Sequence, residues 1–134
     1  MIDRILITLG TLLYTVAPPL ADFNHSHALN PDWPGHARFH MVWLVAANSA
    51  IGLLALHRLW RHGQAQLAAV LGLLVLGGFW VAAATRWLYA GTFNDAGGIE
   101  TQVLGLDANV FAFSIATTLI LAGWALSRRE TGTR

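Results

Sequence analysis

The chain of 134 residues contains no cysteine and no lysine, and only 11% of its residues are charged. The absence of cysteine excludes disulfides, thiolate metal sites and cysteine nucleophiles. Soluble domains carry about 25% charged residues, so this chain has too few charges to cover a water-facing surface. Its formal net charge of +1 provides no basic patch for a nucleic acid, and no nucleic-acid partner is expected.

Apolar residues make up 55% of the chain and gather in four long runs. The runs cover approximately residues 5–21, 37–56, 67–89 and 106–126. Each has about the 17 to 25 residues that a helix needs to cross the hydrocarbon core of a membrane. The helical state is required because lipid offers the backbone no hydrogen-bond partners. The sequence therefore predicts an all-α fold, an integral membrane four-helix bundle that forms a single domain over residues 1–134.

The first run also has features of a signal peptide, with Arg4 before it and Ala21 as a candidate cleavage point. Pro19 fits poorly with the small residues that precede such a point, so we expect a retained span. Pro18 and Pro19 lack backbone donors and are predicted to bend or end the helix.

The arginines indicate the orientation of the bundle. Six of the eight lie on one side of a four-span arrangement, namely Arg4, Arg58, Arg61, Arg128, Arg129 and Arg134. The positive-inside rule places this side in the cytoplasm, so both termini and the linker 57–66 are expected there, in a bacterial inner membrane. The segments 22–35 and 91–105 then face outward.

The first outward segment is rich in side chains that can carry chemistry. Four of the six histidines lie between His25 and His40, and five acidic residues are expected on the same side, Asp22, Asp32, Asp95, Glu100 and Asp107. Asp95 and Glu100 could be brought over the histidines, with Gly97 and Gly98 forming a turn. Asp107 is predicted to cap the fourth helix.

The spacing of the histidines has geometric consequences. Pro31 and Pro34 suit the opening turns of the second helix, with Asn30 or Asp32 as its cap. His36 and His40 are then four residues apart and share one helix face.

Three interpretations of the polar residues remain open. One is a structural network in which His, Asp, Asn and Arg side chains satisfy one another. Another is a metal site formed by His27, His36 and His40, for a divalent ion such as zinc, iron or copper. The third is metal-free acid–base chemistry, with Asp22 and Arg38 orienting the histidines. Arg38 could instead pair with Asp32 or reach lipid headgroups.

The runs Ala21–His27 and Asn30–His40 resemble a motif of a family of small four-span membrane proteins of unknown function. Its pattern reads D-F-N-x-[ST]-H, followed by N-P-x-W-x-x-H-A-R-F-H. His25 falls on a variable position of that pattern, which makes it a weaker ligand candidate than His27. The resemblance implies four spans and assigns no activity.

The leading functional expectation is a membrane enzyme or binding protein for a lipid-like molecule that enters from the bilayer. Its site would contain Asp22, His27, His36, Arg38 and His40. The alternative is a non-catalytic scaffold or accessory subunit whose polar cap is structural. A transport path is disfavoured because the spans contain few ionisable residues. The sequence does not fix the oligomeric state.

The arginine distribution yields a topology prediction. A reporter fused after Arg134 should be active in the cytoplasm and inactive outside, because both termini lie on the arginine-rich side. Activity on the outer side, or a mature protein that begins at Asp22, would contradict the prediction.

Overall fold

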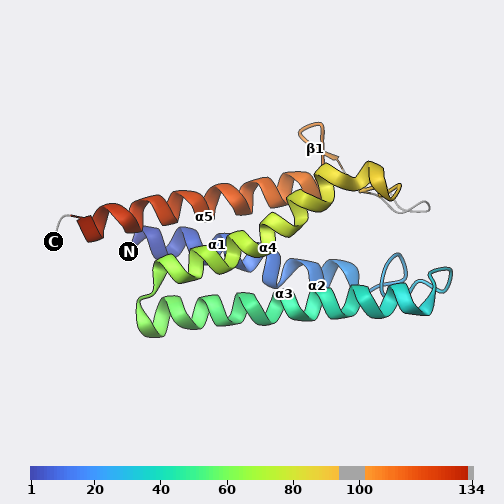
Figure 1. The fold of residues 1–134 in the computed structure, drawn as a ribbon, viewed down its shortest axis with the longest axis horizontal. Helices are drawn as coiled ribbons and strands as arrows, with labels where there is room; N and C mark the ends of the chain where they lie inside the picture. The colour runs from blue at the N-terminus through green and yellow to red at the C-terminus, as the bar shows by residue number, and fades with distance from the viewer. Residues whose placement is uncertain (94–101, 133–134) are drawn as a thin grey trace.

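A computed structural model of the chain describes the backbone of residues 1–93 and 102–132, and the side chains up to residue 129. Four helical segments in this part are long and apolar enough to cross a membrane. The predicted all-α four-helix bundle is therefore confirmed (Figure 1). In chain order, the elements are α1 (Ile2–Thr15), α2 (Ala17–Asp22), α3 (Gly35–His62), α4 (Ala65–Thr85), the 3-10 helix η1 (Arg86–Leu88), β1 (Gln102–Val103), β2 (Leu106–Asp107) and α5 (Ala108–Gly132).

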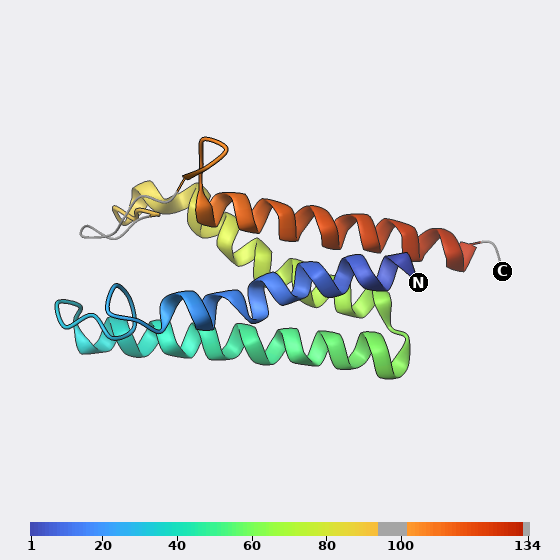
Figure 2. The ribbon, with the colours of Figure 1, turned by 180° about the vertical axis from the view of Figure 1, so that it is seen from behind.

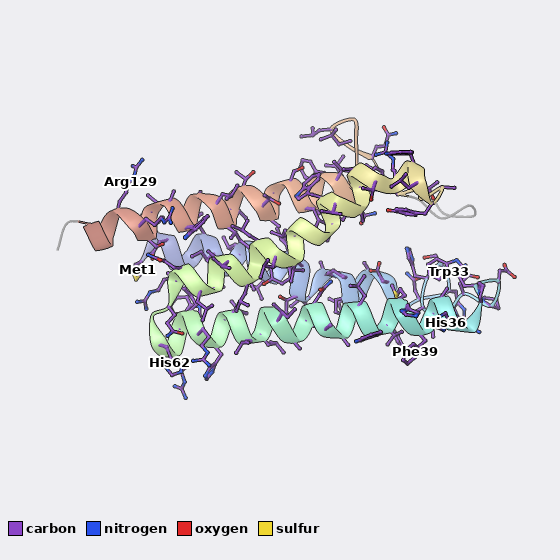
Figure 3. All side chains as sticks on the ribbon, viewed as in Figure 1. Met1, Trp33, His36, Phe39, His62 and Arg129 are labelled. Atoms are coloured by element: carbon purple, nitrogen blue, oxygen red, sulfur yellow. The ribbon has the colours of Figure 1, made fainter. Side chains whose placement is uncertain are left out.

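The bundle has two distinct ends. Figure 3 shows Met1, His62 and Arg129 at one end and Trp33, His36 and Phe39 at the other. We call the first the linker end, because the α3–α4 link of residues 63–64 lies there, and the second the loop end, after residues 23–34. The start of α1 at Met1 and the last turns of α5 at Arg129 lie at the same end as the α3–α4 link, which agrees with the predicted arrangement. Which end faces the cytoplasm stays a prediction.

Helix α1 lies in the middle of the bundle and packs against α3, α4 and α5. Helix α3 packs against α1, α2 and α4 but, within the described residues, not against α5. Figures 1 and 2 show why: α4 begins beside α3 at the linker end and ends beside α5 at the loop end. The α2–α3 pair and the α4–α5 pair therefore separate toward the loop end.

The core cluster lies in the linker half and the middle of the bundle. Its buried apolar residues are Ile7, Tyr14, Ala55, Leu59, Ala65, Ala68, Ala69, Leu76, Ala116 and Ile120. No residue of α2 is buried, and α3 has no buried residue before Gly52. The helices are thus packed tightly at the linker end and loosely at the loop end.

Glycines make the tight packing possible, because they let helix backbones approach closely. A Cβ atom at Gly123 of α5 would lie 2.7 Å from the carbonyl oxygen of Asp3 in α1. A Cβ atom at Gly10 of α1 would lie 2.8 Å from the carbonyl oxygen of Ala116 in α5. The α1–α5 contact is therefore a backbone-to-backbone contact with no room for a methyl group on either side.

The first span is broken where the prolines predicted it. Helix α1 ends at Thr15, Val16 has φ −108° and ψ −40°, and α2 starts with Pro18 and Pro19 in its first turn. A proline in the first turn is tolerated because that N–H has no intrahelical partner. Because of this break, the axis of α2 need not continue the axis of α1.

The predicted linker 57–66 is shorter than expected. Helix α3 continues to His62 and α4 begins at Ala65. Gly63 ends α3 with a left-handed φ of 66°, a conformation that glycine adopts without strain. A small antiparallel hairpin of β1 and β2 was not predicted. Its turn residues Leu104 and Gly105 have φ 54° and 79°, as a two-residue hairpin turn requires.

The glycine contacts generate a stability prediction. Gly123→Ala should destabilise the protein by about 1 to 3 kcal/mol, because the new methyl group meets the backbone of α1, which cannot move cheaply. Gly77→Ala is the matched control, since a Cβ atom there meets no atom within 4 Å. The measurement is the thermal unfolding midpoint in detergent. Equal midpoints for the two variants would contradict the packing described here.

Candidate functional site

Asp22 is the last residue of α2 and the first polar residue of the motif. Its backbone carbonyl accepts a 3.0 Å hydrogen bond from the N–H of Ala28, which folds the following loop back onto the end of α2. The Asp22 side chain is half-buried, and it interacts electrostatically with His27. The structure thus brings Asp22 and His27 together, as the sequence suggested.

The loop that carries His27 is held by its own polar side chains. The amide nitrogen of Asn24 donates to the Ala21 carbonyl at 2.8 Å, and its Oδ1 accepts the Ser26 N–H at 2.9 Å. Asn30 Oδ1 accepts the Asp32 N–H at 2.9 Å. These are local Asx-type bonds, which favour turns over helix. Asn24, Ser26 and Asn30 are therefore loop-building residues.

The same bonds fix the tautomer of His27. Asn24 Oδ1 is an acceptor, so the Ser26 hydroxyl, 2.7 Å away, must donate its only proton to it. Ser26 Oγ lies 2.7 Å from His27 Nδ1 and can then only accept, so Nδ1 carries a proton. In the neutral ring the lone pair is on Nε2. Ser26, and not Asp22, therefore holds the His27 ring in this tautomer.

Asp22 and His27 line a cleft of about 580 Å³ between the separated helices. Asn48 of α3 and Asn109 of α5 are the two other polar residues on its wall. The apolar wall is formed by Leu13, Ala17, Pro18, Ala21, Leu44, Val45, Ile51, Leu74, Val75, Gly78, Phe79, Ala82, Ala112 and Phe113. The cleft lies beside the bent end of the first span, and Asp22 and His27 form part of its polar wall.

His36 and His40 form a separate pair. Their Nε2 atoms are 3.0 Å apart, as the i, i+4 spacing predicted, and both side chains are exposed. Neither residue lines the cleft. In residues 1–93 and 102–129, no three His, Asp or Glu side chains are grouped closely enough to hold a metal ion. The structure therefore does not form the predicted site of His27, His36 and His40, because the folded loop holds His27 against the cleft.

The other predictions for this segment have mixed outcomes. Asn30 and Asp32 do not cap α3, which begins only at Gly35 after Pro34. Arg38 forms no ion pair with Asp22 or Asp32 among the described side chains, and its Nε atom is buried without a hydrogen-bond partner. No hydrogen bond joins Arg38 to a histidine among the described side chains, so its expected role in orienting the histidines is not seen.

Two predictions concern the second loop. Asp107 caps α5 as predicted, because its Oδ1 accepts the N–H groups of Asn109 at 2.8 Å and Val110 at 3.3 Å. Asp95 and Glu100, with the turn at Gly97 and Gly98, lie outside the described residues.

Sequence reasoning missed part of the cleft wall. Asn48 lies deep in the second span and lines the cleft. Phe79 and Phe113 stack at 4.0 Å between ring centroids and join α4 to α5 along the cleft. No local pattern marks such residues, because their role depends on how far the helices separate.

Comparisons with known proteins add one result. The model of a family of unknown function, DUF6640, matches residues 6–133 of the chain. No curated protein and no solved structure matches.

The tautomer assignment can be tested by nitrogen NMR of the imidazole in the purified protein. In the neutral ring, wild-type His27 should be protonated at Nδ1 with a free Nε2, because Ser26 accepts from Nδ1. Ser26→Ala should abolish this preference, whereas Ser26→Thr, which keeps the hydroxyl, should retain it. A wild-type ring protonated at Nε2 would contradict the assignment.

Proposed function

The chain belongs to the DUF6640 family, for which no activity is described, and we propose that it is an integral membrane protein that binds a lipid-like amphiphile in the cleft. The apolar part of the ligand lies between the separated helices, and its polar head contacts Asp22 and His27. One observation carries the proposal: these two motif residues supply polar groups at one place on an otherwise largely apolar wall.

The apolar wall supports a ligand that comes from the membrane. A cleft of about 580 Å³ falls within the range of small-molecule sites. Leu44 and Leu74 line the cleft and are also 61% and 69% exposed. In a bilayer these side chains would contact lipid chains, so an apolar ligand could enter sideways between α3 and α4.

The polar groups select the head of the ligand. Asp22 offers carboxylate acceptors, and His27 offers an Nε2 lone pair whose availability is set by Ser26. Both groups accept hydrogen bonds from the ligand, and Asp22 repels anions. The head should therefore be a donor that is neutral or cationic, such as a hydroxyl or amine group, and not a phosphate or carboxylate.

Acid–base catalysis is a second candidate function, favoured by the fixed tautomer of His27. A general base needs a free lone pair directed at its substrate and a partner that orients the ring. His27 Nε2 would supply the lone pair, the Ser26–His27 bond orients the ring, and Asp22 would stabilise the imidazolium that forms. The nature of the bound head would decide which reaction follows.

The structural-cap alternative is favoured by a different set of residues. Asn24, Ser26 and Asn30 use their side chains to hold the loop. The cap interpretation explains these three residues. It does not explain Asp22 and His27, whose side chains line the cleft.

Filling the cleft tests the proposal. Gly78 lines the cleft and a Cβ atom there meets nothing within 4 Å, so Gly78→Leu should occupy ligand space without disturbing the core. Gly77→Leu is the matched control, because Gly77 is equally uncrowded but does not line the cleft. The measurement is mass spectrometry of lipids extracted from the purified protein.

Wild type and Gly77→Leu should carry the same amphiphile, and Gly78→Leu should lose most of it at an unchanged unfolding midpoint. His27→Ala should also weaken retention, because the head loses a partner. If Gly78→Leu and Gly77→Leu retain the same lipids in the same amounts as wild type, the cleft is not the binding site.

A further inference from the structure

His36 and His40 lie in the first two turns of α3, and their rings meet edge to face at the loop end. The ring centroids are 4.4 Å apart, the ring planes meet at 80°, and the two Nε2 atoms are separated by 3.0 Å. Both Nε2 atoms therefore point toward one small region of space. Figure 3 places His36 at the exposed loop end of the bundle.

We propose that His36 and His40 form a two-histidine site for a transition-metal ion that imidazole favours, with Zn²⁺ and Cu²⁺ as the best candidates. The site is distinct from the cleft and does not depend on the proposed amphiphile. It would leave coordination positions open for water or for a ligand from outside the chain.

The nitrogen separation fits two bonds to one ion. Two Zn–N bonds of about 2.0 to 2.1 Å at a tetrahedral angle place the nitrogens about 3.3 Å apart. At the right angle of a square-planar copper site the separation is about 2.9 Å. The observed 3.0 Å lies between these values, so small rotations of two exposed rings suffice.

The ligand-free pair is held by an N–H···N hydrogen bond between the two rings. In that state one ring is protonated at Nε2 and the other presents its Nε2 lone pair. Metal binding requires both lone pairs, so the donor ring must move its proton to Nδ1 by exchange with solvent. The neutral charge of the two rings is unchanged, and the hydrogen bond has already brought the two ligands together.

A second histidine pair in the chain offers an internal control. His57 and His62 are five residues apart near the linker end, with ring centroids at 5.3 Å, and no hydrogen bond joins their nitrogens. This pair therefore lacks the nitrogen-to-nitrogen hydrogen bond that joins His36 and His40. His25 is a further control, because it is exposed in the loop without a partner histidine.

The experiment is calorimetric titration of the purified full chain with Zn²⁺ and, separately, Cu²⁺, using an affinity tag that contains no histidine. Wild type should bind the ion with saturable stoichiometry. Because loss of even an outer partner weakens a metal site about 10-fold or more, His36→Ala or His40→Ala should lower affinity at least about 10-fold. His25→Ala and the double variant His57→Ala/His62→Ala should bind like wild type.

The stoichiometry identifies the remaining ligands. One ion per chain supports a site completed by water, and one ion per two chains supports a site completed by the histidine pair of a second copy. Equal unfolding midpoints without metal would show that His36→Ala and His40→Ala have not damaged the fold. Absence of saturable binding to wild type, or equal affinity in His36→Ala, His40→Ala and wild type, would overturn the proposal. Neither result affects the lipid test with Gly78→Leu.

Discussion

The close approach of α1 to its neighbours is the constraint on which the rest of the structure depends. Gly10 and Gly123 bring α1 and α5 to backbone contact, and Gly52 of α3 packs against Thr15 of α1. In a membrane, lipid would provide no hydrophobic force that presses helices together, so dispersion contacts between closely approaching backbones would do so. Tight contact ends where α1 ends, and beyond Thr15 no equivalent central helix holds the bundle together.

The cleft is the consequence of this ending. Past the break at Val16, α2 packs against α3, and α4 packs against α5. An apolar space remains between the two pairs. The polar motif of residues 22–27 lies at one part of that space, and its residues have two different roles. Asn24 and Ser26 build the loop and orient the ring, whereas Asp22 and His27 line the cleft.

The sequence predicted those features that depend on local chemistry. The length of the apolar runs indicated four helices, Pro18 and Pro19 indicated the break in the first span, and the four-residue spacing indicated the His36–His40 contact. The position of His27 could not be predicted in this way. It depends on hydrogen bonds within the loop that direct the ring toward the cleft, and sequence separation gives no measure of that folding. The shared three-histidine site was wrong for this reason.

The depth of the cleft would limit the length of the apolar chain that it can hold. The residues of α3 that line it run from Leu44 to Ile51, which is about 10 Å along a helix axis. Below them the packed half begins at Gly52 and Ala55. A ligand whose polar head lies at Asp22 and His27 could extend straight only as far as the packed residues Gly52 and Ala55. A longer apolar chain would have to bend out sideways between α3 and α4. Chain length, in addition to head chemistry, would then set which molecules fit.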